Sequence, residues 1–529
     1  MTRLNRLPRG MVVVLAAAPI VFVTVFYVRP EATLVERAVS ASSIIEVVDD
    51  PSLRRVAWFT AWQAAVSTAL TLAVGLLPAY VLTRYEFHGR RAVTALVTVP
   101  FVLPTVVVGA AFLALLPQSY DNSVTAIVIA HVFFNVAVVV RGVGGMWEQL
   151  PVDLVAAART LGASPWQAMR EITLPLLRPA IAASASVVFL FTFTSFGVVR
   201  ILGGPAHATL EVEIWERATR LGDIGVAAVL SLAQLLVLGV AVIWFARVQA
   251  RHRVALGLRP LSQRRRARSA RERGLVLTVC TAVVIAIGTP LGALVERSTR
   301  TTTGHSLDAW RAVFRGTSTA AQTIGGNSVD AFGAITTSLR FALAAMVISL
   351  VIGGCAAFAI SALGRAGRLL DTGVMLPLGT SAVTIGFGML ITFDRAPVDW
   401  RAAPWLIPLG HALVATPFVV RLLVPTLRAI DPELRDAAAC LGASPTRAWR
   451  EIDLRFVRTP LRTAAGFAIA ISLGEFGATS FLTRQGRTTL PIAIEQLLNR
   501  PGPVFHAQGY VLATVLAALT IGVIAVVNA

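Results

Sequence analysis

One carboxylate, Glu475, lies inside a long apolar stretch of the chain, within the sequence ISLGEFGATS. An ionisable side chain at the centre of a lipid bilayer costs about 2.5–3.5 kcal/mol, so such a group usually faces a cavity or a charged partner. Two interpretations of Glu475 stay open. It lines a path for a polar solute, or it is a structural partner of an arginine such as Arg340 or an interfacial residue.

Two histidines, His131 and His411, also lie in apolar stretches, and they are 280 residues apart. Paired imidazoles could pass a metal ion across a membrane, because neutral imidazole is a common metal ligand. Neither histidine has further metal-ligand residues, such as a cysteine or a pair of carboxylates, near it in the sequence. We therefore favour the interpretation that both histidines are polar side chains whose hydrogen bonds are satisfied at helix contacts. The cysteines, Cys280, Cys355 and Cys440, form no CxxC or CxxxC pair. We therefore predict neither a metal site nor a disulfide framework.

The strongest pattern in the sequence is a polar segment that occurs twice. LGASPWQAMREITLP begins at Leu161 and LGASPTRAWREIDLR begins at Leu441, with ten of fifteen positions identical at an offset of 280 residues. The similarity continues upstream, and we call residues 153–175 and 433–455 the first and second repeated loops. A polar segment present in duplicate within an apolar chain indicates a surface that binds a partner twice.

Each repeated loop is predicted to be a bent pair of short helices. In the first loop, strong helix formers end at Gly162, the residue type that best tolerates a left-handed C-terminal turn. Ser164 then supplies an N-cap, Pro165 suits the first helical position, and Gln167 completes a capping box. We expect Pro175 to stop the second helix. The second loop repeats this pattern with an incomplete capping box.

The surfaces of the two loops carry small side chains, which allow the backbone of another protein to approach closely. The residues that we expect to make this contact are Ala156, Ala157, Ala158, Gly162, Ala163 and Ser164 in the first loop, and Asp436, Ala437, Ala438, Gly442, Ala443 and Ser444 in the second. Because the loops are related by an internal repeat, a partner that binds both should itself be twofold.

The elements that must position these groups are membrane-spanning helices. The 529-residue chain is 56% hydrophobic and 14% charged, with a mean hydropathy of +0.72, whereas a soluble domain carries about 25% charged residues. About 20 apolar residues span a bilayer. We predict twelve such spans, near residues 11–29, 58–82, 92–116, 124–147, 179–200, 226–246, 275–295, 334–362, 370–393, 404–427, 461–481 and 507–527. The fold class is therefore an all-α polytopic membrane protein.

The arginines predict the orientation of these helices. The chain has 47 basic residues, all of them arginine, and a net charge of +19. Excess basic charge marks cytoplasmic loops, which places both termini and both repeated loops in the cytoplasm. The charge is thus a topology signal, with attraction to the lipid bilayer as a side effect, and we expect no nucleic-acid partner. We interpret the first apolar run as a retained helix, because no small-x-small cleavage site follows it.

The internal repeat extends over most of the chain. At the same offset, Arg141 matches Arg421, and Ser195 matches Glu475, which makes Ser195 a second candidate for the substrate path. Six predicted spans separate equivalent points. Because that number is even, the two halves share one orientation, with a pseudo-twofold axis along the membrane normal. A duplicated ion-coupled secondary transporter and a fused pair of permease halves both fit this geometry.

The repeated loops resemble a motif of the permease subunits of type I ATP-binding-cassette (ABC) importers, which reads EAA, three residues, G, nine residues, I-x-L-P. The first loop has Ala156-Ala157-Ala158, Gly162 and Ile172-x-Leu174-Pro175, and the second has Asp436-Ala437-Ala438, Gly442 and Ile452-x-Leu454-Arg455. Ala156 replaces the first glutamate of the motif and Arg455 replaces its final proline. The resemblance covers essentially the whole chain, and the departures leave open whether both loops contribute equally.

The resemblance implies two permease domains, residues 57–250 and 334–529, joined by an Arg-rich cytoplasmic linker at 251–274. Residues 1–56 and 275–333 would each form a membrane helix with an external segment. It also implies two partners, a homodimeric ABC ATPase that holds the two loops and an external solute-binding protein. ATP would be bound by that ATPase, because a Walker A loop needs a lysine and this chain has none. We therefore expect a transport permease that is not an enzyme and carries no cofactor.

The segments TSFGVVRILGGPAHATLEVEIW and SLGEFGATSFLTRQGRTTLPIAIEQLL look most like those of fused permeases for ferric iron or thiamine. Such permeases belong to the bacterial inner membrane, which is the expected location. The alternative, an ion-coupled secondary transporter, would need carboxylates in several spans. Apart from Asp371, at the edge of the span near 370–393, the sequence places only Glu475 inside one.

Overall fold

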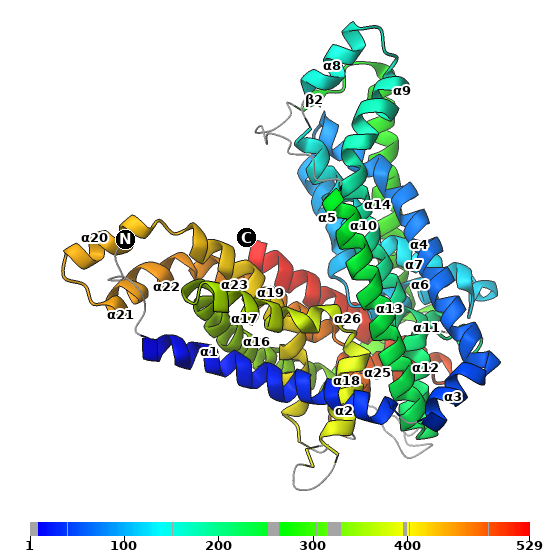
Figure 1. The fold of residues 1–529 in the computed structure, drawn as a ribbon. Helices are drawn as coiled ribbons and strands as arrows, with labels where there is room; N and C mark the ends of the chain where they lie inside the picture. The colour runs from blue at the N-terminus through cyan, green and yellow to red at the C-terminus, as the bar shows by residue number, and fades with distance from the viewer. Residues whose placement is uncertain are drawn as a thin grey trace. The chain divides into compact units, whose positions relative to one another are not determined.

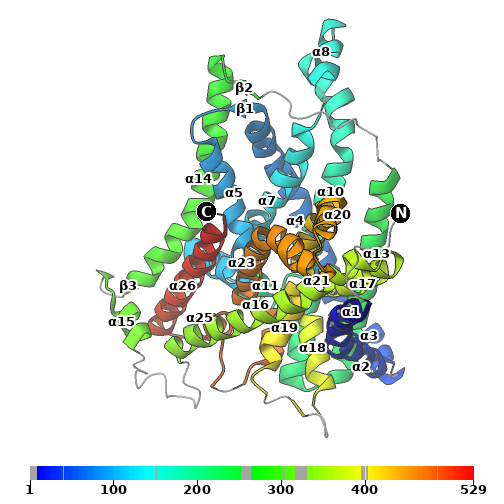
Figure 2. The ribbon, with the colours of Figure 1, turned by 90° about the vertical axis from the view of Figure 1, so that its left-hand side faces the viewer.

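The computed structural model describes residues 9–39, 41–150, 152–251, 264–301, 304–315, 330–394, 399–400, 403–484 and 486–528. These residues form long helices, short connecting helices and two pairs of two-residue strands (Figures 1 and 2). The chain divides into two compact units. Unit 1 comprises Met1–Val47, Ile214–Leu232 and Ser298–Ala529, and unit 2 comprises Val48–Glu213 and Ala233–Arg297.

Unit 2 holds most of the first half of the repeat together with the helix that precedes the second half. Its elements are α4 (Pro51–Arg84), β1 (Tyr85–Glu86), α5 (Arg90–Val102), α6 (Thr105–Leu115), η3 (Gln118–Tyr120), α7 (Val124–Glu148), α8 (Val152–Thr160), α9 (Pro165–Ala168), η4 (Met169–Thr173), α10 (Leu174–Phe193), α11 (Gly197–Leu202), most of α13 (Ile224–Arg251), β2 (Arg265–Arg266) and α14 (Ala270–Thr299). The helix α14 packs Val276 and Val279 against Val81 and Tyr85.

Unit 1 holds the second half together with the N-terminal helix. Its elements are α1 (Arg9–Val23), η2 (Thr24–Val28), α2 (Arg29–Ala38), most of α3 (Ala41–Asp49), η5 (Arg217–Leu221), β3 (Arg300–Thr301), β4 (Gly304–His305), α15 (Asp308–Arg315), α16 (Ala331–Ala362), α17 (Arg365–Met375), η7 (Leu376–Gly379), α18 (Ala382–Thr392), α19 (Leu406–Ala429), α20 (Pro432–Cys440), α21 (Pro445–Ala448), η8 (Trp449–Asp453), α22 (Leu454–Phe456), α23 (Arg458–Gly474), α24 (Gly477–Leu482), α25 (Leu490–Leu498) and α26 (Pro503–Asn528); α12 (Leu210–Glu216) crosses from unit 2 to unit 1. Unit 1 therefore also includes the N-terminal helices and residues 214–232 from the first half of the sequence, and unit 2 includes α14, which precedes the second half of the repeat.

The predicted fold class is confirmed. Within the described residues, nine helices are long and apolar enough to cross a membrane, or eleven if each of two bent pairs is one span. The bent pairs are α5–α6, at 104°, and α17 with η7 followed by α18, at 100°. The remaining predicted span, near 461–481, contains α23 of 17 residues, which ends before Glu475. The bends occur where Pro104 removes a backbone donor and where Ser381 starts a new helix as its N-cap.

The first membrane helix is longer than predicted. The sequence indicates an end near Arg29 and Pro30, but the helix continues through the π-helical turn η2 and through α2 to Ala38. Proline is tolerated here because it follows directly on the π-turn, at the start of α2, where a missing backbone donor costs little. Pro30 is buried, and it packs close to Gly388 of α18. The N-terminal helix is thus fitted to the core of unit 1.

One close helix contact occurs in both units. A Cβ atom on Gly75 would lie 2.8 Å from Cβ of Val139, and one on Gly353 would lie 2.7 Å from Cβ of Val419. Small residues at such contacts let membrane helices approach closely, which compensates for the missing hydrophobic driving force between them. The contact between α4 and α7 in unit 2 is therefore equivalent to the contact between α16 and α19 in unit 1.

We expect Gly386→Ala to destabilise the protein. A methyl group there would overlap the backbone of Ala478 in α24, and overpacking of this kind costs about 1–3 kcal/mol. The matched control is Gly373→Ala in α17, where no atom lies within 4 Å of the new Cβ. Thermal unfolding in detergent should show a lower midpoint for Gly386→Ala and an unchanged or higher one for Gly373→Ala. Equal midpoints for the two variants would show that the contact between α18 and α24 is loose enough to accommodate a methyl group.

Candidate functional site

The first repeated loop has the predicted local structure. Helix α8 ends at a turn in which Gly162 has φ +91°, a left-handed conformation that favours glycine. Ser164 then caps α9. Its hydroxyl accepts from the backbone N–H of Gln167 at 3.2 Å, and the side-chain oxygen of Gln167 accepts from the backbone N–H of Ser164 at 2.8 Å. The predicted capping box is confirmed.

The second repeated loop has the same backbone with different side-chain contacts. Gly442 has φ +80° at the end of α20, and the Ser444 hydroxyl accepts from the backbone N–H of Arg447 at 3.3 Å. The capping box is incomplete, as predicted, because Arg447 cannot return the hydrogen bond. Its guanidinium instead donates to Glu451 at 2.9 Å.

The predicted helix stop at Pro175 is wrong. Helix α9 continues through the π-helical turn η4 into α10, so that residues 165–193 form one membrane-spanning helix. Pro175 lies in the first turn of α10, directly after the π-turn, where a missing backbone donor is tolerated. The second loop has the equivalent π-turn η8, followed by α22 and α23. The first loop therefore continues without a break into a membrane-spanning helix, and the second leads into α23 through the turn residue Val457.

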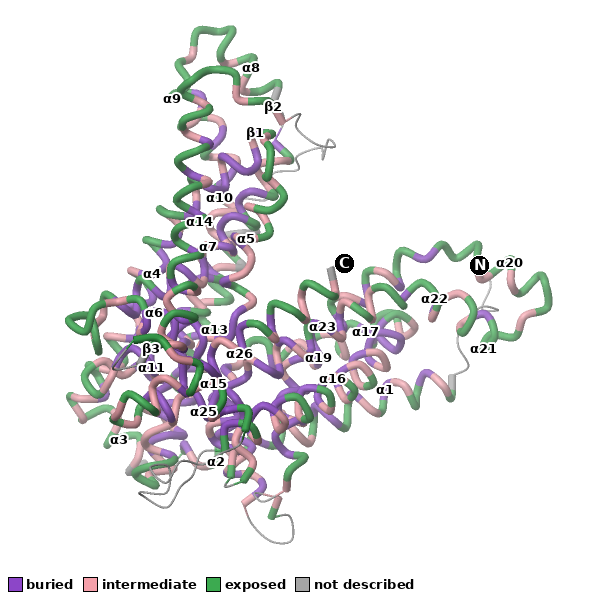
Figure 3. Tube along the Cα trace, turned by 180° about the vertical axis from the view of Figure 1, so that it is seen from behind, coloured by how far each residue is buried: buried purple, intermediate pink, exposed green. Residues whose placement is uncertain are grey.

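Both loops lie at the ends of long helices of their own unit, and most of their residues are exposed (Figures 1 and 3). Their pattern of buried, half-buried and exposed residues agrees at every position from 153 to 170 and from 433 to 450. Of the predicted contact residues in each loop, four are exposed, and Ala158, Ala163, Ala438 and Ala443 are half-buried. The structure thus presents two equivalent surfaces.

The sequence-based list of contact residues missed two leucines. Among the large apolar side chains in the described part of the chain, Leu161 and Leu441 are the most exposed, at 88% each. An exposed apolar side chain at the same place in two otherwise polar loops is typical of a protein interaction site. The signal was present in the sequence, because both leucines belong to the repeated segment and directly precede the turn glycines.

Beyond each loop, the connected membrane helix breaks at equivalent points. Residues 194–196 separate α10 from α11, and Glu475 and Phe476 separate α23 from α24. Gly197 begins α11 against Thr105 and Val106, and Gly477 begins α24 against Ala382 and Val383. Both glycines therefore combine a helix break with close packing.

Glu475 is buried at the second break, with 3% of its side chain exposed. Its carboxylate accepts from the backbone N–H groups of Ala478 at 2.8 Å and Thr479 at 2.9 Å, and from the Thr479 hydroxyl. His411 Nε2 lies 3.2 Å from the same carboxylate. The contact with the start of α24 is favourable because the first N–H groups of a helix attract negative charge. The partner of Glu475 is thus His411 and not Arg340.

The two histidines are satisfied at helix contacts, as favoured from the sequence. His131 contacts the hydroxyls of Ser67 at 3.3 Å and Ser195 at 2.8 Å, and His411 contacts those of Ser472 at 2.7 Å and Thr479 at 2.8 Å. Ser195 and Glu475, the candidates for the substrate path, therefore both lie beside the histidine of their half. In the residues that the structure describes, no three His, Cys, Asp or Glu side chains gather as a metal site would require.

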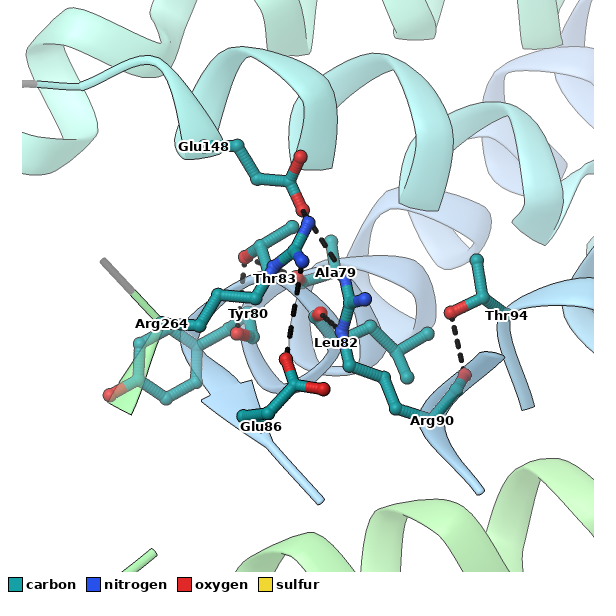
Figure 4. A network of polar contacts seen from close by, with 9 residues as sticks. All are labelled: Ala79, Tyr80, Leu82, Thr83, Glu86, Arg90, Thr94, Glu148 and Arg264. Atoms are coloured by element: carbon teal, nitrogen blue, oxygen red, sulfur yellow. Dashed lines mark hydrogen bonds and ion pairs between the residues drawn. The ribbon is translucent and has the colours of Figure 1, made fainter. Parts of the chain in front are cut away.

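The end of the Arg-rich linker is bound to unit 2 through a polar network (Figure 4). Arg264 lies 2.9 Å from Glu148 and 4.0 Å from Glu86, and Arg90 lies 3.2 Å from Glu148. Next to this network, β2 pairs in parallel with β1. Residues 252–263 of the linker lie outside the described part of the chain. Its last residues therefore hold α14 against the end of α4.

Comparison with known proteins agrees with this architecture. Residues 71–254 and 349–527 each match the family described as "Binding-protein-dependent transport system inner membrane component". The chain is 28% identical over 506 residues to the thiamine transport system permease protein ThiP of Brucella abortus (strain 2308), covering 90% of this chain and 88% of that protein.

Two further relatives also match most of this chain and most of their own length. The ThiP protein of Escherichia coli (strain K12) is 26% identical over 86% of this chain and 85% of its own length. A probable ABC transporter permease protein, y4fN of Sinorhizobium fredii (strain NBRC 101917 / NGR234), is 23% identical over 91% of this chain and 88% of its own length. With the family domain present in both halves, the chain belongs to the inner-membrane components of binding-protein-dependent transport systems, in the fused two-half form of a type I ABC importer permease.

Proposed function

We propose that this permease carries thiamine, or a solute closely related to it, into the cell. The single observation that supports this substrate is the similarity to thiamine permeases, which extends over 90% of this chain and 88% of the Brucella protein. The sequence alone left ferric iron open as well. Thiamine is favoured because both ThiP relatives described above are thiamine permeases by name.

The two repeated loops are proposed as the contacts with a separate ABC ATPase. Three features support this role: the loops are equivalent in exposure, they carry exposed leucines at the same place, and each continues into a membrane helix. An ATPase dimer that closes on ATP would move both loops and favour one arrangement of the membrane helices over the other. Such a shift requires that the ATPase bind the two arrangements with different affinity.

The orientation that fits this role has both termini and both loops in the cytoplasm, with the solute-binding protein on the opposite side. The excess of arginine in the loops on the side of the termini supports it. ATP would then be bound by the partner, because this chain has no lysine with which to build a Walker A loop. The permease itself is proposed to need no cofactor.

The test is uptake by proteoliposomes that contain this chain, its ATPase and its solute-binding protein. We expect ATP-dependent accumulation of labelled thiamine, and ATPase activity that rises when thiamine-loaded binding protein is added. Ferric iron offered in the same way should do neither. Uptake driven by a proton or sodium gradient without ATP would overturn the importer, and ATP-dependent uptake of iron alone would overturn the substrate.

A further inference from the structure

The second repeated loop contains an ion pair that joins its two limbs, the helical segments before and after the glycine turn. Arg435 lies in α20, before the Gly442 turn, and Asp453 lies in η8, after it. The guanidinium of Arg435 donates through Nε to both carboxylate oxygens of Asp453, at 3.2 and 3.3 Å, and through Nη2 to one of them. The side chains are 23% and 8% exposed. Bidentate arginine–carboxylate pairs of this kind are strong and geometrically specific.

At the positions equivalent to Arg435 and Asp453, the first repeated loop has residues that cannot form this pair. At the offset of 280 residues, Val155 takes the place of Arg435, and Thr173 takes the place of Asp453. The Thr173 hydroxyl donates to the carbonyl of Ala168 at 3.4 Å, within its own limb. Since the backbones of the two loops agree in the turn glycine, the N-cap and the π-turn, the ion pair is a difference in side-chain chemistry alone.

The pair also lines a cavity between the second loop and the ends of two long helices. A cavity of about 340 Å³ separates this loop from the ends of α16 and α19. Arg435 and Asp453 line it, together with Phe358 and Trp449, whose rings meet edge to face with centroids 5.2 Å apart. Trp449, Ile452 and Leu454, which follow the turn, pack against the core of unit 1, whereas Arg435 lies in the helix before the turn. The ion pair therefore ties the helix before the turn to the part of the loop that is anchored in the core.

We propose that Arg435 and Asp453 are positioning residues that make the second repeated loop stiffer than the first. This inference rests on the proposed function, in which an ATPase moves both loops. A stiff loop passes the motion of its partner to α23 without loss, whereas a loop that bends absorbs part of it. The two halves of the permease are then driven unequally, through the second half more than through the first.

The first readout is hydrogen exchange in the assembled permease, measured by mass spectrometry. In the wild type, the backbone amides of residues 434–441 should exchange about 10-fold more slowly than those of residues 154–161. Asp453→Thr and Arg435→Val give the second loop the residues of the first, and each should remove the difference. Equal exchange in the two wild-type loops, or exchange in the second loop that neither variant changes, would overturn the proposal.

A reciprocal variant keeps the test decisive if the single substitutions fold poorly. Val155→Arg combined with Thr173→Asp installs the pair in the first loop, and we expect slower exchange there by several-fold. Arg435→Val combined with Asp453→Thr removes both charges, and so separates loss of the link from the effect of one unpaired charge. Unchanged exchange in the first loop of the reciprocal variant would show that this pair does not control stiffness.

The second readout is the amount of solute transported per ATP hydrolysed. A residue needed only for folding would lower the amount of active protein and leave this ratio unchanged. We expect Asp453→Thr to lower the ratio several-fold, and an unchanged ratio would overturn the positioning role. Hydrogen exchange does not depend on the solute, so a failure to transport thiamine would contradict the proposed function and leave the exchange comparison valid.

Discussion

Leu441→Asp should abolish stable association with the ATPase while leaving the permease folded. Leu441 is 88% exposed and its side chain supports no core contact that the substitution would remove. At the centre of an interface, loss of an apolar anchor combined with burial of a charge costs about 3 kcal/mol, or roughly 100-fold in affinity. Co-purification with the ATPase and ATPase stimulation should both be lost.

The matched control for this variant is Leu369→Asp in α17, another exposed leucine of unit 1 that lies outside the repeated loops. It should leave ATPase binding unchanged. Leu161→Asp tests the other loop, and it should also weaken binding, since Leu161 has the same exposure as Leu441. If Leu441→Asp binds the ATPase as well as the wild type, the second loop is not the contact, whatever the transported solute.

Glu475→Ala should be the most destabilising substitution in the membrane region that we consider. The carboxylate satisfies two backbone N–H groups at the start of α24, the Thr479 hydroxyl and His411. Buried donors left without an acceptor cost about 1–3 kcal/mol each. We expect a loss of about 3 kcal/mol, because neighbouring groups relax in part. Thermal unfolding in detergent should therefore shift downward by roughly 6 °C.

Ser195→Ala is the comparison that the repeat provides. It removes one hydrogen bond, to His131, and should cost only about 1 kcal/mol. Glu475→Gln separates structure from transport. If the main role of the carboxylate is to stabilise the helix break, Glu475→Gln should also destabilise the protein. The amide nitrogen of glutamine replaces one carboxylate oxygen and cannot accept a hydrogen bond, so either the N–H of Ala478 or that of Thr479 loses its acceptor. If stability is unaltered and only the KM for the solute changes, the charge belongs to the substrate path instead.

Local chemistry explains why the loops could be predicted from the sequence. The left-handed glycine, the Ser164 cap and the capping box each depend on residues no more than four positions apart. Interactions over such short separations are encoded in sequence order. The same reasoning failed at Pro175, because a π-turn in the preceding residues removes the constraint that would otherwise end the helix. The position of Leu161 and Leu441 directly before the turn glycines is also a local feature of the sequence, although the predicted contact residues did not include them.

By itself, the sequence determined that the chain is a duplicated, all-helical membrane protein with two equivalent polar loops, because hydropathy, arginine placement and a constant offset are properties of residue order. Only the tertiary structure decided which groups meet across long separations. It places α14 in unit 2 and α1 in unit 1. It also shows that Glu475 pairs with His411 rather than with Arg340, and that Arg435 pairs with Asp453 in the second loop, where the first loop has no equivalent pair. Such pairings follow from how helices pack, and side-chain packing between distant helices leaves no periodic signal along the chain.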